Sequence, residues 1–433
     1  MVIDISDKTL PDPEDIKNDF EDYIKNKLGS DFQVTSSINF QNMDNTASEE
    51  INPSKNSSNT KSKINFSLTP KELKENLDRF IINQHEAKKA LAIAICDHYR
   101  HIQHINGLTL QQRSHYKKQN ILLLGPTGVG KSYLVQKIAA MIGVPFIHAD
   151  ATRFSEVGYM GANVDDLVKD LVIAAENDLN AAENGIIYLD EIDKIAISPK
   201  NTGKDVNGRG VQYGLLKLME ETDVDLRANH DIASQMQAFI EMQQKGRLEK
   251  QVINTRNILF IMSGAFSGLE EIIIERTQNC KLGFKSTEDS KNNAESNVAD
   301  LLSTKDLINF GLEPEFIGRL PVRVQCHNLS VDDLYQILKN SEETLVKQYQ
   351  NSFFSYGIQL EFSDSALRRI AELSFAEKTG ARGLMTVLEK SLRDFKYELP
   401  STNIKYLKIT AEVINNPTNA LQNILANIKP IMN

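Results

Sequence analysis

The sequence predicts an α/β fold: a parallel sheet flanked by helices, followed by a smaller, mostly helical domain. Strand-like apolar runs occur at 120–124, 145–149, 186–190, 258–263 and 322–325. They alternate with helical stretches at 131–142, 165–182 and 211–220. Such alternation is typical of parallel strands connected through helices that cover both faces of a sheet.

The pattern changes after His327. The residues 330–333, Ser-Val-Asp-Asp, resemble a capping box that opens a helix. A strand-like run follows at 358–362, and helices are expected near 364–376 and 381–397. Helices therefore dominate this second, smaller domain.

A complete phosphate-binding loop follows the first apolar run, in the strand-to-helix setting that such a loop requires. Its residues are Gly125, Pro126, Thr127, Gly128, Val129, Gly130, Lys131 and Ser132. The glycines let backbone N–H groups curl around an anion, and the next helix points its positive end at the charge. Lys131 can reach the outer phosphates and Ser132 can ligate Mg²⁺.

Two adjacent carboxylates end the apolar run 186–190, some distance further along the chain. Asp190 can hold the Mg²⁺ shell, and Glu191 can polarise a water for attack on the γ-phosphate. Acidic residues commonly begin loops, so the pair alone is weak evidence for a catalytic site. Because the pair follows a phosphate loop, it indicates that the protein hydrolyses a nucleoside triphosphate and does not only bind it.

Composition is that of an ordinary soluble protein, because 41% of the 433 residues are hydrophobic and 25% are charged. The formal net charge of −9 argues against a broad nucleic-acid footprint. We expect neither a nucleic-acid partner nor a membrane segment, because no apolar stretch approaches the roughly 20 residues needed to span a bilayer.

Cysteine usage and the N-terminus favour a cytoplasmic, reducing setting. Cys96, Cys280 and Cys326 are far apart and odd in number, so they make neither a disulfide framework nor a zinc site. The first residues lack the basic start of a signal peptide.

The folded body carries further motifs that lie where one family has its own or that match them. They are Phe80-Ile81-Ile82-Asn83-Gln84, Gly158-Tyr159-Met160-Gly161, Leu282-Gly283-Phe284, Glu315-Phe316-Ile317-Gly318-Arg319 and Gly380-Ala381-Arg382-Gly383. With them, the region from about Leu68 to Ser401 resembles the ClpX family of AAA+ unfoldases, the ATP-binding subunits of the Clp protease. The HslU family is more distant, because its inserted domain would need far more residues between Asp193 and Ile258.

The resemblance implies a nucleotide site for ATP and Mg²⁺. Ile81 and Ile82 would pack on adenine, and Tyr133 would join the phosphate loop in binding. Arg319 would reach the γ-phosphate of a neighbouring subunit, and Arg382 would sense the phosphate in its own subunit. Glu191, Arg319 and Arg382 are thus the expected catalytic residues, and the expected assembly is a homo-hexamer.

The resemblance also implies two contacts with other proteins. Tyr159 and Met160 would line a central pore and grip a substrate polypeptide, since an aromatic ring between glycines can swing and grip without reading sequence. Leu282, Gly283 and Phe284 would dock on a ClpP-type peptidase; the alternative is that this apolar tripeptide packs a loop against the core.

The chain departs from the family in two places. The family's N-terminal four-cysteine zinc domain is not expected, because Cys96 is the only cysteine before the phosphate loop. The segment at 228–253, where a basic pore-entrance loop should fall, lacks the family's Arg-Lys-His cluster. The sequence therefore does not identify the substrates, the degradation tags or the adaptors.

Five regions are expected. They are an N-terminal extension (1–34), a flexible Ser/Asn-rich linker (35–66), an AAA+ large ATPase domain (67–326), an AAA+ small domain (327–410) and a C-terminal tail (411–433). A short amphipathic helix at 13–28 either docks a partner or is marginal.

Three functions remain compatible with the sequence. The first is an ATP-driven unfoldase and translocase that feeds a ClpP-type peptidase. The second is the same motor acting alone as a remodelling chaperone. The third is a nucleic-acid motor, which the acidic balance and Tyr159 disfavour.

Overall fold

The computed structural model describes residues 66–105, 118–154, 162–197, 206–226, 252–279, 301–342 and 344–426. All of these belong to one compact unit, Thr60–Asn433. Several expectations lie outside the described residues: the 13–28 helix, the linker, Tyr159 and Met160, Leu282 to Phe284, and nearly all of 228–253.

The centre of the large domain is a five-stranded sheet. Its strands are β1 (Ile121–Leu124), β2 (Phe146–Asp150), β3 (Ile186–Asp190), β6 (Leu259–Gly264) and β7 (Val322–Gln325). They are all parallel and stand in the order β2-β3-β6-β1-β7. The five predicted strands and the α/β fold class are thereby confirmed. The three central strands, β1, β3 and β6, are buried along almost their whole length, and strands buried on both faces read as continuous apolar runs, which is why the pattern identified them.

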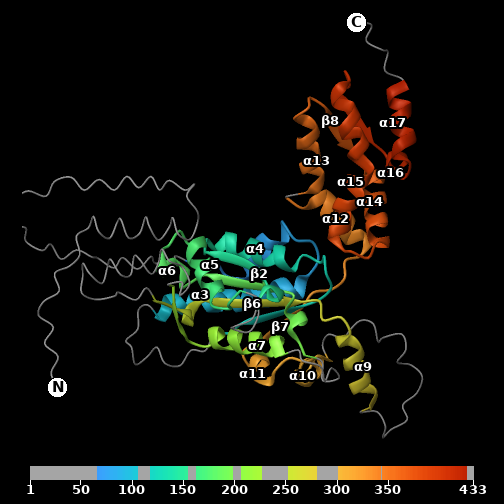
Figure 1. The fold of residues 1–433 in the computed structure, drawn as a ribbon. Coiled ribbons are helices and arrows are strands. Elements are labelled where there is room, and N and C mark those ends of the chain that lie inside the picture. Colours follow the sequence, from blue (N-terminus) through green and yellow to red (C-terminus); the bar gives the residue numbers. More distant parts are fainter. Residues whose placement is uncertain are drawn as a thin grey trace, which may run out of the picture. The chain divides into compact units, whose positions relative to one another are not determined.

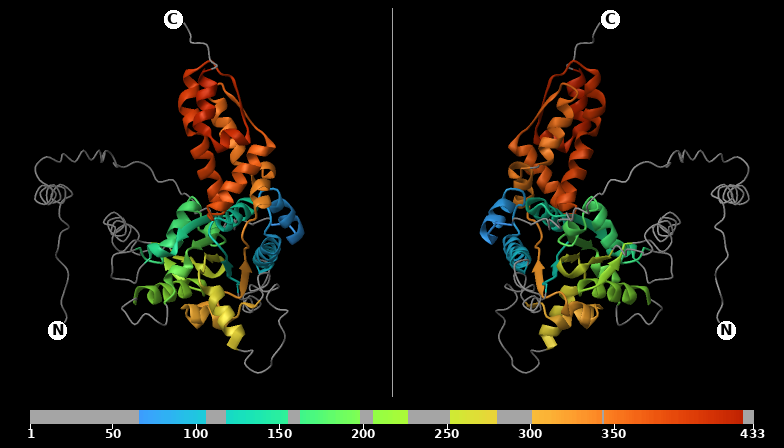
Figure 2. Two further views of the ribbon diagram at one scale, coloured as in Figure 1. Left: turned by 90° about the vertical axis from the view of Figure 1, so that its right-hand side faces the viewer. Right: turned by 90° about the vertical axis from the view of Figure 1, so that its left-hand side faces the viewer.

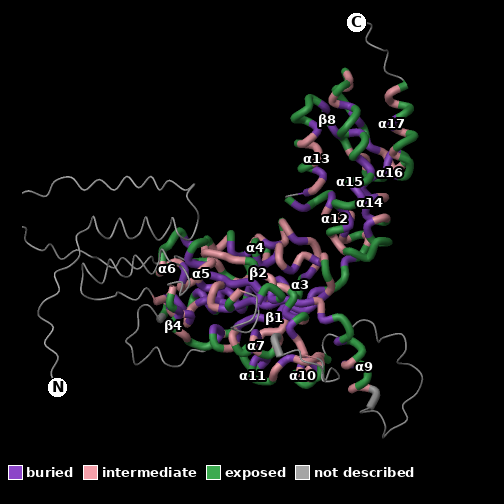
Figure 3. Tube along the Cα trace, viewed as in Figure 1, coloured by how far each residue is buried: buried purple, intermediate pink, exposed green. Residues whose placement is uncertain are grey.

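Helices cover both faces of this sheet. Those of one face are α2 (Pro70–Asp78), α3 (His85–Ile105) and α4 (Lys131–Ile142), which share an apolar cluster with Ile121 and Leu123. Those of the other face include α5 (Asp166–Ala174) and α7 (Val206–Met219), packed with Leu122 and Leu124. Figure 1 shows α4 on one side of the strands and α7, α10 and α11 on the other. Buried residues follow the strands themselves (Figure 3).

The remaining elements of the large domain are short. They are α6 (Leu179–Ala182), β4 (Asp223–Asp225), β5 (Val252–Asn254), α9 (Leu269–Asn279), α10 (Thr304–Phe310), α11 (Pro314–Gly318) and the 3₁₀ turns Ala151–Arg153, Ile192–Ile195 and Thr255–Asn257. Strands β4 and β5 pair antiparallel.

The helix predicted at 165–182 is wrong as a single element, because the chain breaks between α5 and α6. Glu176 and Asn177 adopt left-handed backbone angles, with φ of 54° and 65°. Asp178 then caps α6 by accepting from Asn180 N and Ala181 N. Asn tolerates the left-handed region and Asp is a favoured N-cap, so the break has a local cause.

The small domain is mostly helical. It contains α12 (Val331–Asn340), α13 (Leu345–Phe354), β8 (Gln359–Phe362), α14 (Asp364–Ala376), α15 (Ala381–Glu398), the 3₁₀ turn Leu399–Ser401, β9 (Tyr406–Ile409), α16 (Ala411–Asn415) and α17 (Pro417–Ala426). Several of these helices run side by side in both views of Figure 2. The predicted capping box is confirmed: Ser330 Oγ accepts from Asp333 N at 3.1 Å, and Asp333 Oδ2 accepts from Ser330 N at 2.8 Å.

The segment set apart as a C-terminal tail forms helices in its described part. Helix α16 packs against α14, and α17 packs against α15. Val413, Ile414 and Leu421 are buried there, in the apolar cluster that also includes Ile121 and Leu123. In the described ranges, no helix is both long enough and apolar enough to cross a membrane.

Candidate nucleotide site

The phosphate loop leaves β1 and enters α4 through backbone conformations that glycine adopts most readily. Gly125, Gly128 and Gly130 have φ of 143°, 76° and 95°. A Cβ on Gly125 would lie only 2.4 Å from the carbonyl oxygen of Cys326, so this position has no room for a side chain. Gly130 precedes α4 and offers no side chain to cap it. The first N–H groups of α4 are therefore open to an anion.

Lys131 lies at the start of α4 and is buried. Its Nζ donates to Gly125 O at 2.6 Å and to Pro126 O at 2.8 Å. Burial lowers the pKa of Lys131, while the nearby Asp190 carboxylate opposes that shift. A lysine ammonium has three donor hydrogens, so one remains for a phosphate oxygen after these two bonds.

A buried chain of hydroxyl groups orients Asp190 at the end of β3. Asp190 Oδ1 accepts from Ser263 Oγ and, at 3.0 Å, from Glu191 N. The hydroxyl of Tyr188 lies 2.6 Å from Ser263 Oγ. Burial raises the pKa of Tyr188 well above its ordinary value, so the phenol keeps its proton. A polar residue inside the fully buried strand β6 is the sequence signal that could have indicated Ser263.

Glu191 follows Asp190 in a left-handed backbone conformation, with φ of 57°. Such a conformation costs a non-glycine residue about 1–3 kcal/mol and is concentrated at functional sites. The turn after it is held firmly, because Ile192 and Ile195 are buried. Asp193 Oδ1 also accepts from Ala265 N at 3.2 Å, which ties the turn to the end of β6.

These groups meet in a cavity of about 560 Å³. The predicted site residues that line it are Ile81, Ile82, Thr127, Gly128, Val129, Gly130, Lys131, Ser132, Tyr133, Asp190, Glu191 and Arg382. Gly125 and Pro126 do not line it; they border a neighbouring cavity and contribute carbonyl groups to Lys131. A volume of this size suits a nucleotide-sized ligand.

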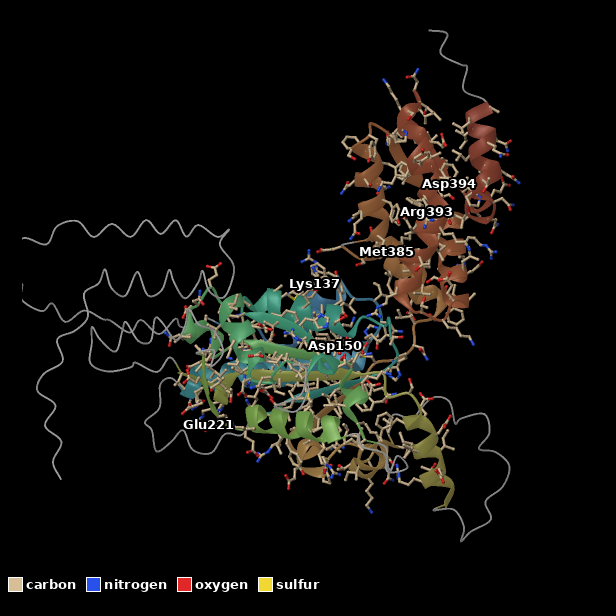
Figure 4. All side chains as sticks on the ribbon, in the orientation of Figure 1. Lys137, Asp150, Glu221, Met385, Arg393 and Asp394 are labelled. Carbon is tan, nitrogen blue, oxygen red and sulfur yellow. The ribbon has the colours of Figure 1, made fainter. Side chains whose placement is uncertain are left out.

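The cavity also contains residues beyond the predicted site residues. Phe80 and Ala381 stand in the family motifs named above, and the others are Asp193, Lys194, Ala265, Ser267, Leu329, Ile337, Ser341, Leu345 and Met385. Many are apolar and come from the small domain, as does Met385 of α15, which is labelled in Figure 4. Lys137 of α4, also labelled there, places its Nζ 4.9 Å from the centre of the Phe80 ring. The cavity thus has one apolar part, suited to a base, and one polar part, suited to phosphates.

The phosphate loop and the start of α15 touch through their backbones. Ala381 N donates to Gly128 O at 2.8 Å. A Cβ on Gly128 would lie 2.1 Å from Thr379 O, and one on Gly380 would lie 2.6 Å from Gly128 O. This close approach requires glycine at both positions and holds the next residue, Arg382, at the cavity.

A Gly380→Ala variant is expected to bind ATP at least about tenfold more weakly, because the new methyl group would push α15 away from the loop. The measurement is a titration with a fluorescent ATP analogue. Gly357→Ala is the matched control: Gly357 is also in the small domain with φ of 76°, but a Cβ there meets nothing within 4 Å. Equal ATP affinities in the two variants would show that the contact is unimportant.

Arg319 lies away from this cavity. It is the C-cap residue of α11, forms an ion pair with Glu220, and lines a separate cavity of about 240 Å³. The structure therefore does not bring Arg319 to the nucleotide cavity of its own chain.

Two family models match the two domains. Residues 116–323 match the AAA domain (Cdc48 subfamily), and residues 329–404 match the C-terminal, D2-small domain, of ClpB protein. These matches confirm a AAA+ large domain followed by a AAA+ small domain.

Relatives that match most of the chain identify a more specific family than the two domain models do. The ATP-dependent Clp protease ATP-binding subunit ClpX of Borrelia duttonii (strain Ly) is 42% identical over 352 residues, which cover 80% of this chain and 79% of the relative. The protein of the same name from Borrelia recurrentis (strain A1) gives the same values. The chain therefore belongs to the ClpX family of AAA+ ATPases.

Proposed function

We propose that this ATPase unfolds proteins, threads them through a hexameric ring, and delivers them to a ClpP-type peptidase. One observation carries the proposal. A single cavity joins the phosphate loop and the Asp190–Glu191 pair of the large domain to Arg382 of the small domain. A nucleotide in such a cavity contacts both domains, so its hydrolysis changes the contacts between them.

The large domain supplies binding and hydrolysis. Lys131 and the N–H groups at the start of α4 bind the outer phosphates of ATP. Glu191 orients the attacking water toward the γ-phosphate and accepts a proton from that water. Ser132 and Asp190 offer the hard oxygen ligands that Mg²⁺ prefers, and both line the cavity; the ion, when bound, neutralises charge on the phosphates.

The small domain supplies the coupling. Arg382 is the second residue of α15 and follows Ala381, whose N–H is bonded to the loop. Loss of the γ-phosphate removes a charge partner of Arg382, so the helix and its domain are released to rotate. In the ring, Arg319 of one subunit completes the site of the next.

The pulling contact is assigned to Tyr159 and Met160, and the peptidase contact to Leu282, Gly283 and Phe284. Both assignments rest on the motifs of the ClpX family. If the second contact is not used, the same motor acts alone as a remodelling chaperone.

The test separates chemistry, pulling and docking. Tyr159→Ala should keep ATPase activity and lose unfolding of a stable fluorescent substrate, because only the grip is removed; Tyr159→Phe, which keeps the ring, is the control. Phe284→Ala should keep unfolding and lose degradation by an added ClpP-type peptidase, because one aromatic anchor can carry much of a small interface.

Three outcomes would count against these roles. Wild-type unfolding by Tyr159→Ala would refute the pore assignment. Normal degradation by Phe284→Ala would refute the docking assignment. Loss of ATPase in Tyr159→Ala would mean that the variant damages the motor itself.

A further inference from the structure

The backbone at Arg319 is fixed to the centre of the large domain. Arg319 N donates to Phe316 O at 3.1 Å, and Arg319 O accepts from Asn120 Nδ2 at 3.2 Å. Asn120 is buried, and its Oδ1 accepts from Phe260 N on β6 at 3.3 Å. Only the side chain of Arg319 therefore remains to be oriented.

Glu220 is the ion-pair partner of this side chain. It follows the last residue of α7, and its Oε1 accepts from Arg319 Nη2. The backbone of Glu220 is itself anchored, because its N–H donates to Leu216 O at 3.1 Å and its carbonyl accepts from Thr255 Oγ1 at 3.4 Å. The side chains of Arg319 and Glu220 are 43% and 44% exposed, so the pair contributes little to stability.

The geometry leaves part of the guanidinium available. Arginine has five N–H donors in a planar fork, and Glu220 is bonded to one terminal nitrogen. Nη2 keeps a second N–H, which pairs with an N–H of Nε or of Nη1 on the same edge of the guanidinium, so a phosphate can still be bound through two parallel hydrogen bonds. A carboxylate that holds one end of the fork thus restricts the direction in which the rest of it points.

The other charges of the 240 Å³ cavity have different partners. Lys118 Nζ donates to Thr255 O at 2.7 Å and to Ile258 O at 3.0 Å. Arg256 lies 3.9 Å from Glu221, which is labelled in Figure 4. Glu220 and Glu221 are adjacent acids in one cavity, and each forms an ion pair with a different arginine.

We propose that Glu220 is a positioning residue for the ATPase reaction: it holds the Arg319 guanidinium so that its remaining donors face the nucleotide of the neighbouring subunit. This inference rests on the proposed action of Arg319 across the subunit boundary. It adds a residue that contacts no nucleotide and acts through Arg319 alone.

The experiment measures kcat and KM for ATP in the full chain carrying Glu220→Ala. We expect kcat to fall about tenfold, since misplacement of a catalytic group by about 1 Å can cost up to ~100-fold. KM should stay within about twofold, because Glu220 does not line the nucleotide cavity. The loss of kcat should be smaller in Glu220→Gln, because the amide oxygen still accepts the hydrogen bond from Arg319 although the charge is gone. Glu221→Gln, the matched control, should keep both constants.

A double-variant cycle separates positioning from a structural role. In an Arg319→Ala background, Glu220→Ala should cause no further loss of kcat, because the group it orients is gone. A further loss of similar size, a raised KM, or an equal loss in Glu221→Gln would overturn the inference.

The cycle also distinguishes this inference from the proposed function. Full turnover in Arg319→Ala alone would refute the action of Arg319 and, with it, the role of Glu220. Collapse of turnover in Arg319→Ala with normal turnover in Glu220→Ala would refute only the positioning role.

Discussion

A Glu191→Gln variant is expected to bind ATP as tightly as the wild type and to hydrolyse it about 10²–10⁴-fold more slowly. The amide keeps the size of the side chain and its hydrogen-bonding oxygen, but it cannot take a proton from water. Phosphate binding is left intact, because Lys131 and the loop backbone supply it. Isothermal titration with ATP and a phosphate-release assay measure the two quantities.

The complementary variant is Lys131→Ala. It should lose ATP binding, because the buried ammonium and its contacts with the loop disappear together. Undiminished turnover in Glu191→Gln would contradict the assignment of Glu191. Equal loss of ATP binding in both variants would contradict the separation of binding from hydrolysis.

An Arg319→Ala variant is expected to lose turnover by about 10³–10⁵-fold, the range found for arginines supplied to NTPase sites. Arg319 lies outside the nucleotide cavity of its own chain, and we propose that it acts on the nucleotide of a neighbouring subunit. Mixing Arg319→Ala subunits with Glu191→Gln subunits should therefore restore part of the activity, since some interfaces then combine an intact Glu191 with an intact Arg319.

The mixing result is decisive for the action of Arg319 in trans. No recovery at any mixing ratio, in rings shown by co-purification of a tagged with an untagged variant to contain both, would contradict it. A fully active monomer would contradict it as well, because a monomer has no neighbouring arginine.

Much of the fold could be predicted from sequence because the central strands are apolar on both faces. Runs such as 186–190 have no polar face that could mimic another element, and the structure confirms them. The break at Glu176 and Asn177 was missed, because an apolar helical period continues across it. Helices α16 and α17 were missed because their few buried residues are anchored by α14 and α15, which is a tertiary effect.

The phosphate end of the cavity could be predicted because its residues follow each other in recognisable motifs. The end suited to a base could be predicted only partly. Ile81 and Ile82 stand in a family motif, but Leu329, Ile337 and Met385 reach the cavity through packing of the small domain. Ser263 illustrates the same limit: its role depends on lying beside Asp190, a contact between residues far apart in the chain.

The measurement that tests the central claim most directly is substrate trapping by Glu191→Gln rings. Purified from cells in ATP, these rings should retain proteins in the pore and release them when ATP is replaced by ADP. A Glu191→Gln/Tyr159→Ala double variant should retain far less, because the grip is missing. Quantitative mass spectrometry of the retained protein gives the comparison. Retention that depends on ATP and on Tyr159 is the predicted result; equal retention in ATP and ADP, or retention of nucleic acid in place of protein, would contradict the account.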